Sequence, residues 1–221
     1  FIVLCGCTLT IKYMKKTLAV LQFCLLFFVG VPSEVKSQNP YDAPTQIVFT
    51  IDWSASMRSH ALNFVEMLRQ SLESDMINLD TTSIAIITFG KKSTTVLPLT
   101  MNKVHARHVL DSLSSNPPCG YESNALFGFF ESQDALISDE GENATLNRYI
   151  VFVCDGFVTD GSDGIEFARY LERSHGIDIY SVHFPSIVGS TRESTAYMKA
   201  IATDREHYIL MPEKGIFSKI R

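Results

Sequence analysis

The chain has 221 residues, of which 46% are hydrophobic, and a formal net charge of −5. This composition is typical of a globular domain with a sizeable apolar core. The acidic balance, without any polybasic run, excludes the electrostatic footprint of a nucleic-acid-binding protein and that of a protein held on an anionic membrane surface.

Residues 1–37 form a segment that differs from the rest of the chain. Met14 is followed by two lysines and then by an apolar run over residues 17–31, which is short for a membrane span. Small residues suited to signal-peptidase cleavage come next. We therefore predict a signal peptide that starts at Met14 and a mature protein that begins at Gln38. An uncleaved anchor helix is the alternative, because apolar residues also precede Met14.

The mature part of the chain is more acidic than the whole. Without residues 1–37 it carries 15 basic and 23 acidic side chains, a net charge of −8. Its two cysteines, Cys119 and Cys154, permit one disulfide in an exported protein but do not require it. Cys154 ends an apolar strand-like run, which favours a buried free thiol.

Apolar runs of strand length alternate with segments of helical periodicity along residues 38–221. The predicted strands are 45–53, 82–90, 93–100, 148–156, 177–184 and 207–211, and the predicted helices are 58–74, one capped by Asn102, one with Leu126, Phe129, Phe130 and Leu136 on its apolar side, 163–175 and 192–202. This alternation predicts one α/β domain with a mostly parallel sheet and helices on both faces. Residues 212–221 could begin a final helix that the chain does not complete.

Two finer features accompany this pattern. Pro98 lies within the third predicted strand, which indicates an edge strand because proline cannot donate a ladder hydrogen bond. Asp163 and Glu166 have the spacing of a capping box and predict the start of the fourth helix.

Polar side chains follow two of the predicted strands. Asp52 ends the first strand and is followed by Ser54 and Ser56, and Asp155 ends the fourth. Ligands bind outside the carboxyl ends of parallel strands, so these side chains are expected at one edge of the sheet. Carboxylate, hydroxyl and water oxygens suit Mg²⁺. The sequence places no histidine or cysteine in this cluster, which argues against zinc.

The segment DWSAS resembles the D-x-S-x-S motif of von Willebrand factor type A domains. ITFG, LPLT and VFVCDG also stand where that family has similar segments, and the resemblance covers residues 45–211. It implies a Rossmann-like three-layer sandwich with a metal-ion-dependent adhesion site. Ser54 and Ser56 would bind the metal directly, and Asp52 and Asp155 would bind it directly or through water. A protein ligand's own acidic side chain would complete the metal shell.

The third loop departs from the family pattern. The family supplies a threonine there, whereas direct alignment of CGYESNALFG, residues 119–128, places Tyr121 at that position. Glu122 resembles the glutamate that integrin β-subunits use at this point, and Ser123 is the nearest hydroxyl. Glu122 is favoured, with Ser123 as the alternative. The expected metal ligands are therefore Asp52, Ser54, Ser56, Glu122 and Asp155.

The resemblance implies a binding module rather than an enzyme. Its cation would be Mg²⁺, with Mn²⁺ or Ca²⁺ as alternatives, its partner a protein, and its location secreted, periplasmic or on the cell surface. One alternative is a structural domain that keeps the fold with a degenerate metal site. Another is a metal-dependent hydrolase, which is disfavoured because haloacid-type phosphatases use D-x-D and Ser54 replaces the second acid.

Overall fold

The computed structural model describes residues 44–118, 120–137, 146–185 and 191–211. The predicted signal peptide and the segment 212–221 lie outside these ranges. The described strands form one sheet in the order β3-β2-β1-β4-β5-β6, which is parallel except for β3. The strands are β1 (Thr45–Asp52), β2 (Thr82–Phe89), β3 (Ser93–Thr100), β4 (Asn147–Cys154), β5 (Ile177–His183) and β6 (Tyr208–Leu210).

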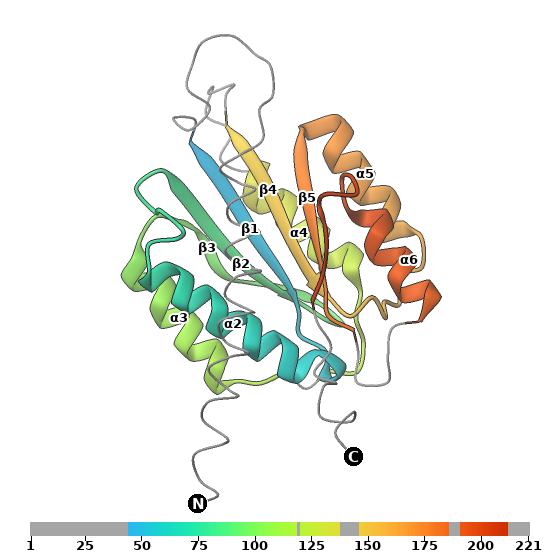
Figure 1. Cartoon of the computed structure of the whole chain (residues 1–221), viewed down its shortest axis with the longest axis horizontal. Coiled ribbons are helices and arrows are strands. Elements are labelled where there is room, and N and C mark those ends of the chain that lie inside the picture. Colours follow the sequence, from blue (N-terminus) through green and yellow to red (C-terminus); the bar gives the residue numbers. More distant parts are fainter. Residues whose placement is uncertain (1–43, 119, 138–145, 186–190, 212–221) are drawn as a thin grey trace, which may run out of the picture.

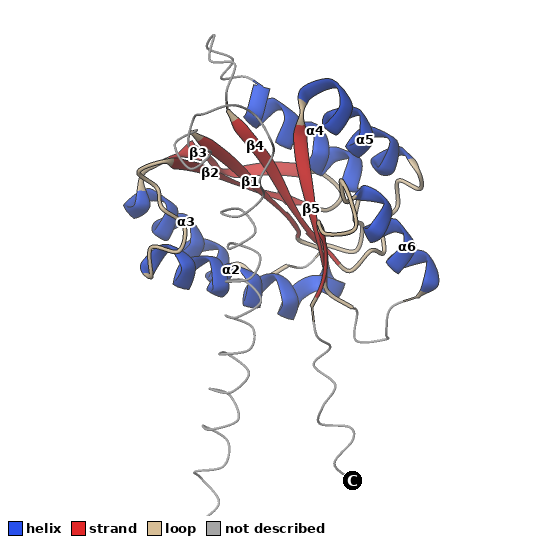
Figure 2. Cartoon of the chain, turned by 45° about the horizontal axis from the view of Figure 1, so that its top comes forward, coloured by secondary structure: helices blue, strands red, loops and turns tan. Residues whose placement is uncertain are grey.

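Helices cover both faces of the sheet. They are the 3₁₀ helix η2 (Ala55–Met57) and the α-helices α2 (Arg58–Glu73), α3 (Lys103–Ser115), α4 (Ala125–Ile137), α5 (Asp163–His175) and α6 (Arg192–Ile201). Helices α2 and α3 lie on one face and α4, α5 and α6 on the other (Figures 1 and 2). The predicted three-layer α/β sandwich is confirmed. Within the described ranges, every helix is too short or too polar to cross a membrane.

The central strands are apolar on both sides because both faces are covered. In β1, Phe49 and Ile51 belong to the core under α2, whereas Val48 belongs to the core under α4 to α6. Thr50 also faces α4, and its Oγ1 lies 2.6 Å from the Oγ of Ser132. The absence of polar alternation along this strand therefore reflects two buried faces, as the sequence indicated.

Strand β3 is the antiparallel edge of the sheet. Its register against β2 shifts around Ile86, and Pro98 is exposed with no partner in the ladder. A proline is tolerated there because an edge strand leaves some N–H groups unpaired. The edge position predicted from Pro98 is confirmed.

The helix starts agree only in part with the sequence predictions. The Asn102 side chain accepts a hydrogen bond from the His105 N–H at 3.0 Å, so the predicted cap of α3 is confirmed. The predicted capping box of α5 is wrong. Asp163 is already the first residue of that helix, and the preceding residue makes no side-chain cap. Asp163 and Glu166 lie instead in the first turn, where negative charge complements the helix dipole.

Helix α4 turns one predicted core residue outward. Phe129 is fully buried and stacks on Phe152 of β4, with ring centroids 4.7 Å apart. Phe130, expected on the apolar side, is 41% exposed and packs edge-on against Phe167 of α5. Adjacent helical positions are about 100° apart, so both rings cannot face the same sheet.

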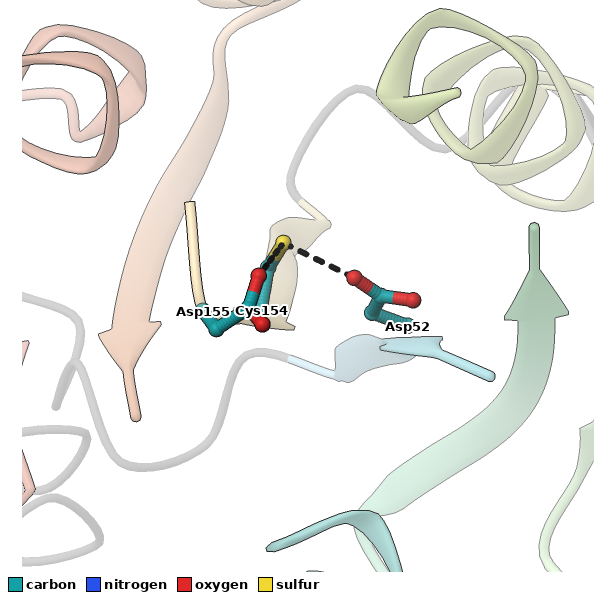
Figure 3. A group of neighbouring side chains, drawn as sticks. All are labelled: Asp52, Cys154 and Asp155. Carbon is teal, nitrogen blue, oxygen red and sulfur yellow. Dashed lines mark hydrogen bonds between the residues drawn. The ribbon is translucent and has the colours of Figure 1, made fainter. Parts of the chain in front are cut away.

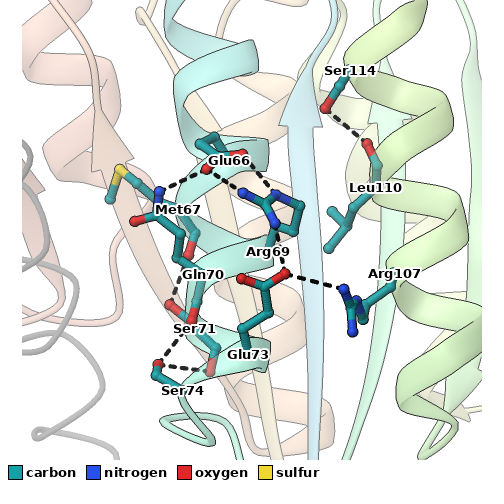
Figure 4. A network of polar contacts seen from close by, with 10 residues as sticks. All are labelled: Glu66, Met67, Arg69, Gln70, Ser71, Glu73, Ser74, Arg107, Leu110 and Ser114. Atoms are coloured by element: carbon teal, nitrogen blue, oxygen red, sulfur yellow. Dashed lines mark hydrogen bonds and ion pairs between the residues drawn. The ribbon is translucent and has the colours of Figure 1, made fainter.

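A surface network joins α2 to α3 (Figure 4). Arg69 pairs with Glu66 at 2.7 Å and with Glu73 at 2.6 Å, and Glu73 also meets Arg107 of α3 at 3.3 Å. Ion pairs that are this open to solvent contribute little to stability. The apolar core beneath the two helices therefore holds them against the sheet.

Candidate metal site

The carboxyl ends of β1 and β4 lie side by side. The parallel register pairs Ile51 with Val153, so Asp52 at the end of β1 and Asp155 just after β4 lie at the same edge of the sheet. Both aspartates are fully buried. Within the described residues, neither forms an ion pair with a lysine, arginine or histidine.

The Asp52 carboxylate accepts hydrogen bonds from three groups. The Ser54 N–H donates to its Oδ1 at 2.8 Å, and the Ser123 hydroxyl donates to its Oδ2 at 2.8 Å. The Cys154 thiol donates to the same Oδ2 at 3.1 Å. Burial raises the pKa of Asp52 to about 6, although the hydrogen bonds from Cys154 and Ser54 lower it in part. Ionised Asp52 is therefore costly in the metal-free chain, and a cation would relieve that cost.

The two serines of the first loop differ in exposure. Ser54 is 3% exposed, whereas Ser56 in η2 is open to solvent, and their hydroxyl oxygens lie 3.1 Å apart. The Ala55 N–H donates to the Gly120 carbonyl at 2.6 Å, which ties the first loop to the third. The pair of hydroxyls thus leads from the buried acids toward the surface.

The third loop brings Ser123, and not Glu122, into contact with Asp52. Glu122 is exposed, and its carboxylate lies 3.4 Å from the Lys91 ammonium. Ser123 is 4% exposed, and its carbonyl accepts from the Thr159 N–H at 2.8 Å and from the Thr159 hydroxyl at 3.0 Å. These bonds anchor the loop at Ser123, and the neighbouring residue is left on the surface.

Tyr121, which aligns with the family threonine, is 97% exposed. It lies one residue after Gly120, which bridges to Ser54. A side chain this exposed has no contact with the buried acids. Tyr121 therefore does not take the place of the family's threonine beside the buried acids.

The expectation that no cysteine joins the cluster is wrong. Cys154 is fully buried and carries a free thiol, and its Sγ lies 3.1 Å from Asp52 Oδ2 and 3.9 Å from Asp155 Oδ1 (Figure 3). Burial raises the pKa of the thiol well above its usual value, and the charges of Asp52 and Asp155 raise it further. The strand period of two could have revealed this, because Cys154 shares a sheet face with the buried Ile150 and Phe152.

Asp155 has one satisfied and one unsatisfied oxygen. The Phe157 N–H donates to Oδ1 at 3.0 Å, whereas the buried Oδ2 has no hydrogen-bond partner in the part of the chain that the structure describes. His183 contacts the backbone of Asp155 and not its carboxylate, with Nε2 3.1 Å from the Asp155 carbonyl oxygen. Burial lowers the pKa of the His183 imidazole. An unpaired buried carboxylate oxygen needs an explanation, and a bound cation would supply it.

The donor set fits a divalent cation. Asp52, Cys154 and Asp155 each offer one donor atom, and these atoms all lie within 4.8 Å of one another. Ser54 and Ser123 add hydroxyl groups at the same strand ends. Two buried acids that lack a cationic partner within the described ranges, surrounded by small polar groups, provide an environment suited to a metal ion.

The sequence matches the model of the von Willebrand factor type A domain over residues 46–219. The chain therefore belongs to this family. No match was found among curated protein sequences.

Solved structures with the same fold include adhesion and matrix proteins. Proximal thread matrix protein 1 from the mussel byssus, solved with a zinc-occupied metal-ion-dependent adhesion site, is 17% identical with a TM-score of 0.60, over 81% of this chain and 43% of that one. The pilus adhesin SpaC from Lactobacillus rhamnosus GG is 13% identical with a TM-score of 0.65, over 80% and 29%. The von Willebrand factor domain of the pilus tip protein Mfa5 from Porphyromonas gingivalis is 10% identical with a TM-score of 0.62, over 77% and 90%.

These likenesses show the fold alone. This chain spans less than half the length of the mussel protein and of SpaC. The three neighbours are a thread matrix protein, a pilus adhesin and a pilus tip protein.

Proposed function

We propose that this chain is an exported binding module that engages a protein ligand through a divalent cation at the ends of β1 and β4. One observation carries the proposal: Asp52 and Asp155 are fully buried together, and Asp155 Oδ2 has no hydrogen-bond partner among the residues described. Two buried acids that no cationic side chain among the described residues neutralises are costly unless a cation joins them.

The residues divide into an inner and an outer part. Asp52 and Asp155 would supply the negative charge, directly or through water, and Ser54 and Ser56 would offer their hydroxyls. Because Ser56 is exposed, the cation would be reached from solvent on that side. An acidic side chain of the partner would complete the shell there. Mg²⁺ is the proposed cation, with Mn²⁺ or Ca²⁺ as alternatives.

A thermal-shift titration tests the metal. Mg²⁺ or Mn²⁺ should raise the melting temperature of the EDTA-treated protein, since a ligand that binds only the folded state stabilises it. Asp155→Asn should abolish this rise, because it removes the charge of the unpartnered carboxylate. Asp111→Asn, at an exposed acid on α3, is the matched control and should keep it. A full metal-induced rise in Asp155→Asn would exclude this site, and no rise in the native protein would favour a structural domain with a degenerate site.

The third-loop ligand remains a choice between Glu122 and Ser123, and the contacts favour Ser123. Its hydroxyl already lies 2.8 Å from Asp52, whereas Glu122 pairs with Lys91 on the surface. Ser123→Ala should weaken Mg²⁺ binding about tenfold, a loss of about 1.4 kcal/mol. Glu122→Gln should leave the affinity unchanged. The reverse result would assign the role to Glu122 and restore the interpretation made from sequence.

Ligand engagement and export need separate tests. A pull-down from the native envelope should recover a protein partner in Mg²⁺ but not in EDTA, and Asp155→Asn should recover none. Exported material should begin at or near Gln38, with residues 38–221 as one domain. N-terminal sequencing checks this, and retention of residues 17–31 in a membrane fraction would support the anchored alternative.

A further inference from the structure

The donor set at the strand ends is not composed of oxygen alone. Cys154 is the last residue of β4, and its side chain faces the same side of the sheet as Asp52 (Figure 3). Its sulfur contacts one buried aspartate at 3.1 Å and approaches the other at 3.9 Å. The proposed Mg²⁺ site makes no use of this atom.

We propose that the Cys154 thiolate is a ligand of the bound cation and that it makes the site select Zn²⁺ over Mg²⁺ and Ca²⁺. The inference rests on the proposed function, because it keeps the same site and partner, but it replaces Mg²⁺ by Zn²⁺ as the preferred cation. Two observations carry it together: the sulfur lies within 4 Å of an oxygen of each acid, and the buried Asp155 Oδ2 has no hydrogen-bond partner among the described residues.

The spacing of the donors suits a tetrahedral zinc ion. With Zn–S near 2.3 Å and Zn–O near 2.1 Å, adjacent sulfur and oxygen ligands of a tetrahedron are about 3.6 Å apart. The sulfur-to-oxygen distances of 3.1 and 3.9 Å lie on either side of that value. The two sulfur-to-oxygen pairs, to Asp52 Oδ2 and Asp155 Oδ1, therefore need changes of only about half an ångström, and the donor atoms of the two acids lie within 4.8 Å of each other.

One backbone contact would stabilise the thiolate once a cation offsets the charge of the two acids. The Gly156 N–H donates to Cys154 Sγ at 3.2 Å, and hydrogen bonds to an ionised acceptor are the stronger ones. On binding, the S–H bond breaks, its proton passes to solvent, and a sulfur lone pair forms the bond to the cation. Thiolate favours zinc, whereas Mg²⁺ and Ca²⁺ prefer oxygen.

The competing role for Cys154 is that of a simple hydrogen-bond donor to Asp52. Cys154→Ser separates the two roles, because a serine hydroxyl can still donate to Asp52 but is a poor zinc ligand. A donor role predicts that the preference between Zn²⁺ and Mg²⁺ is unchanged in this variant. A ligand role predicts that the preference for zinc is lost while Mg²⁺ binding persists.

Co²⁺ is the spectroscopic probe for the sulfur bond. The full-length EDTA-treated chain, titrated with Co²⁺, should develop a near-ultraviolet sulfur-to-cobalt charge-transfer band that Zn²⁺ abolishes by competition. Cys154→Ser should lack this band and bind Zn²⁺ at least tenfold more weakly, with Mg²⁺ affinity within twofold of native. Calorimetric titration measures both affinities.

A variant that keeps Cys154 as its only cysteine is the matched control and should retain the band. It assigns the band to Cys154 even if Cys154→Ser does not fold. Loss of the band in that control would overturn the inference, as would Mg²⁺ binding without any sulfur band in the native chain, and both would leave the proposed function standing. Failure of every cation to bind the native chain would overturn the inference and the proposed function together.

Discussion

Asp52→Asn should make the metal-free protein more stable at neutral pH, although Asp52 belongs to the proposed site. Burial, with no cationic partner in the described residues, raises the pKa of this carboxyl from 3.8 to about 6. A rise of this size corresponds to about 3 kcal/mol against the ionised form. Asparagine is nearly isosteric and carries no charge, and re-pairing its amide with Ser54 and Ser123 will offset part of the gain. We expect Asp52→Asn to be more stable by about 1–3 kcal/mol at pH 7.

The pH dependence identifies the cause of this effect. Because the pKa of Asp52 is higher in the folded chain than in the unfolded chain, the folded state binds the proton more tightly. Its contribution to stability is complete below about pH 4 and is lost as the pH rises through about 6. The native and Asp52→Asn proteins should therefore be similar in stability near pH 4 and diverge above it.

Urea unfolding in EDTA, at intervals from about pH 4 to pH 8, measures both effects. Asp111→Asn controls for loss of an exposed charge and should show no such divergence. Mg²⁺ at a thousand times Kd should reverse the order of the two proteins, since only the native chain gains about 4.1 kcal/mol. A metal-free Asp52→Asn protein that is less stable than native at pH 7, or a difference that does not change with pH, would refute the reasoning.

Three further substitutions test how the fold supports the site. Gly156→Ala should destabilise the chain by about 1–3 kcal/mol and weaken Mg²⁺ binding, because φ is +81° and a Cβ would lie 2.6 Å from the Ser194 carbonyl; urea unfolding and calorimetry check this. Phe129→Ala should cost about 3–5 kcal/mol in urea unfolding, since it empties the stack on Phe152, yet the metal-induced thermal shift should persist. Thr191→Ala should cost about 1 kcal/mol and speed hydrogen exchange in the first turn of α6, because its hydroxyl accepts from the Ser194 N–H; unchanged exchange would contradict the cap.

The periodicity of the apolar residues and the chemistry of single residues were enough to predict the architecture. Apolar runs bounded by helical segments predict a parallel sheet covered on both faces, and the described strands agree to within one or two residues. The edge position of β3 followed from Pro98, because the restriction acts on the residue's own backbone. The α5 capping box failed because its spacing is only a local pattern. The helix does begin at Asp163, as predicted, but without a side-chain cap, and the reciprocal cap occurs at α6 between Thr191 and Ser194.

At the strand ends, too, the sequence predicts what regular spacing controls but not what a loop contact controls. Asp52 and Asp155 were assigned to one sheet edge because parallel strands share a direction, whatever the side chains do. The choice between Glu122 and Ser123 depends on how a loop is anchored, here by the bonds from Thr159 to the Ser123 carbonyl, and no period governs a loop.

The sequence by itself determined the family, the layers and the placement of the two aspartates of the proposed site at one sheet edge, since these follow from residue types at regular spacing along one chain. Only the tertiary structure decided which third-loop side chain meets Asp52 and that a cysteine lies between the acids. Asp52 and Cys154 are 102 positions apart, and their side chains lie 3.1 Å from each other. This contact requires both the register of β1 against β4 and the same sheet face for the two side chains. That register depends on packing across the whole sheet, which a single segment does not contain.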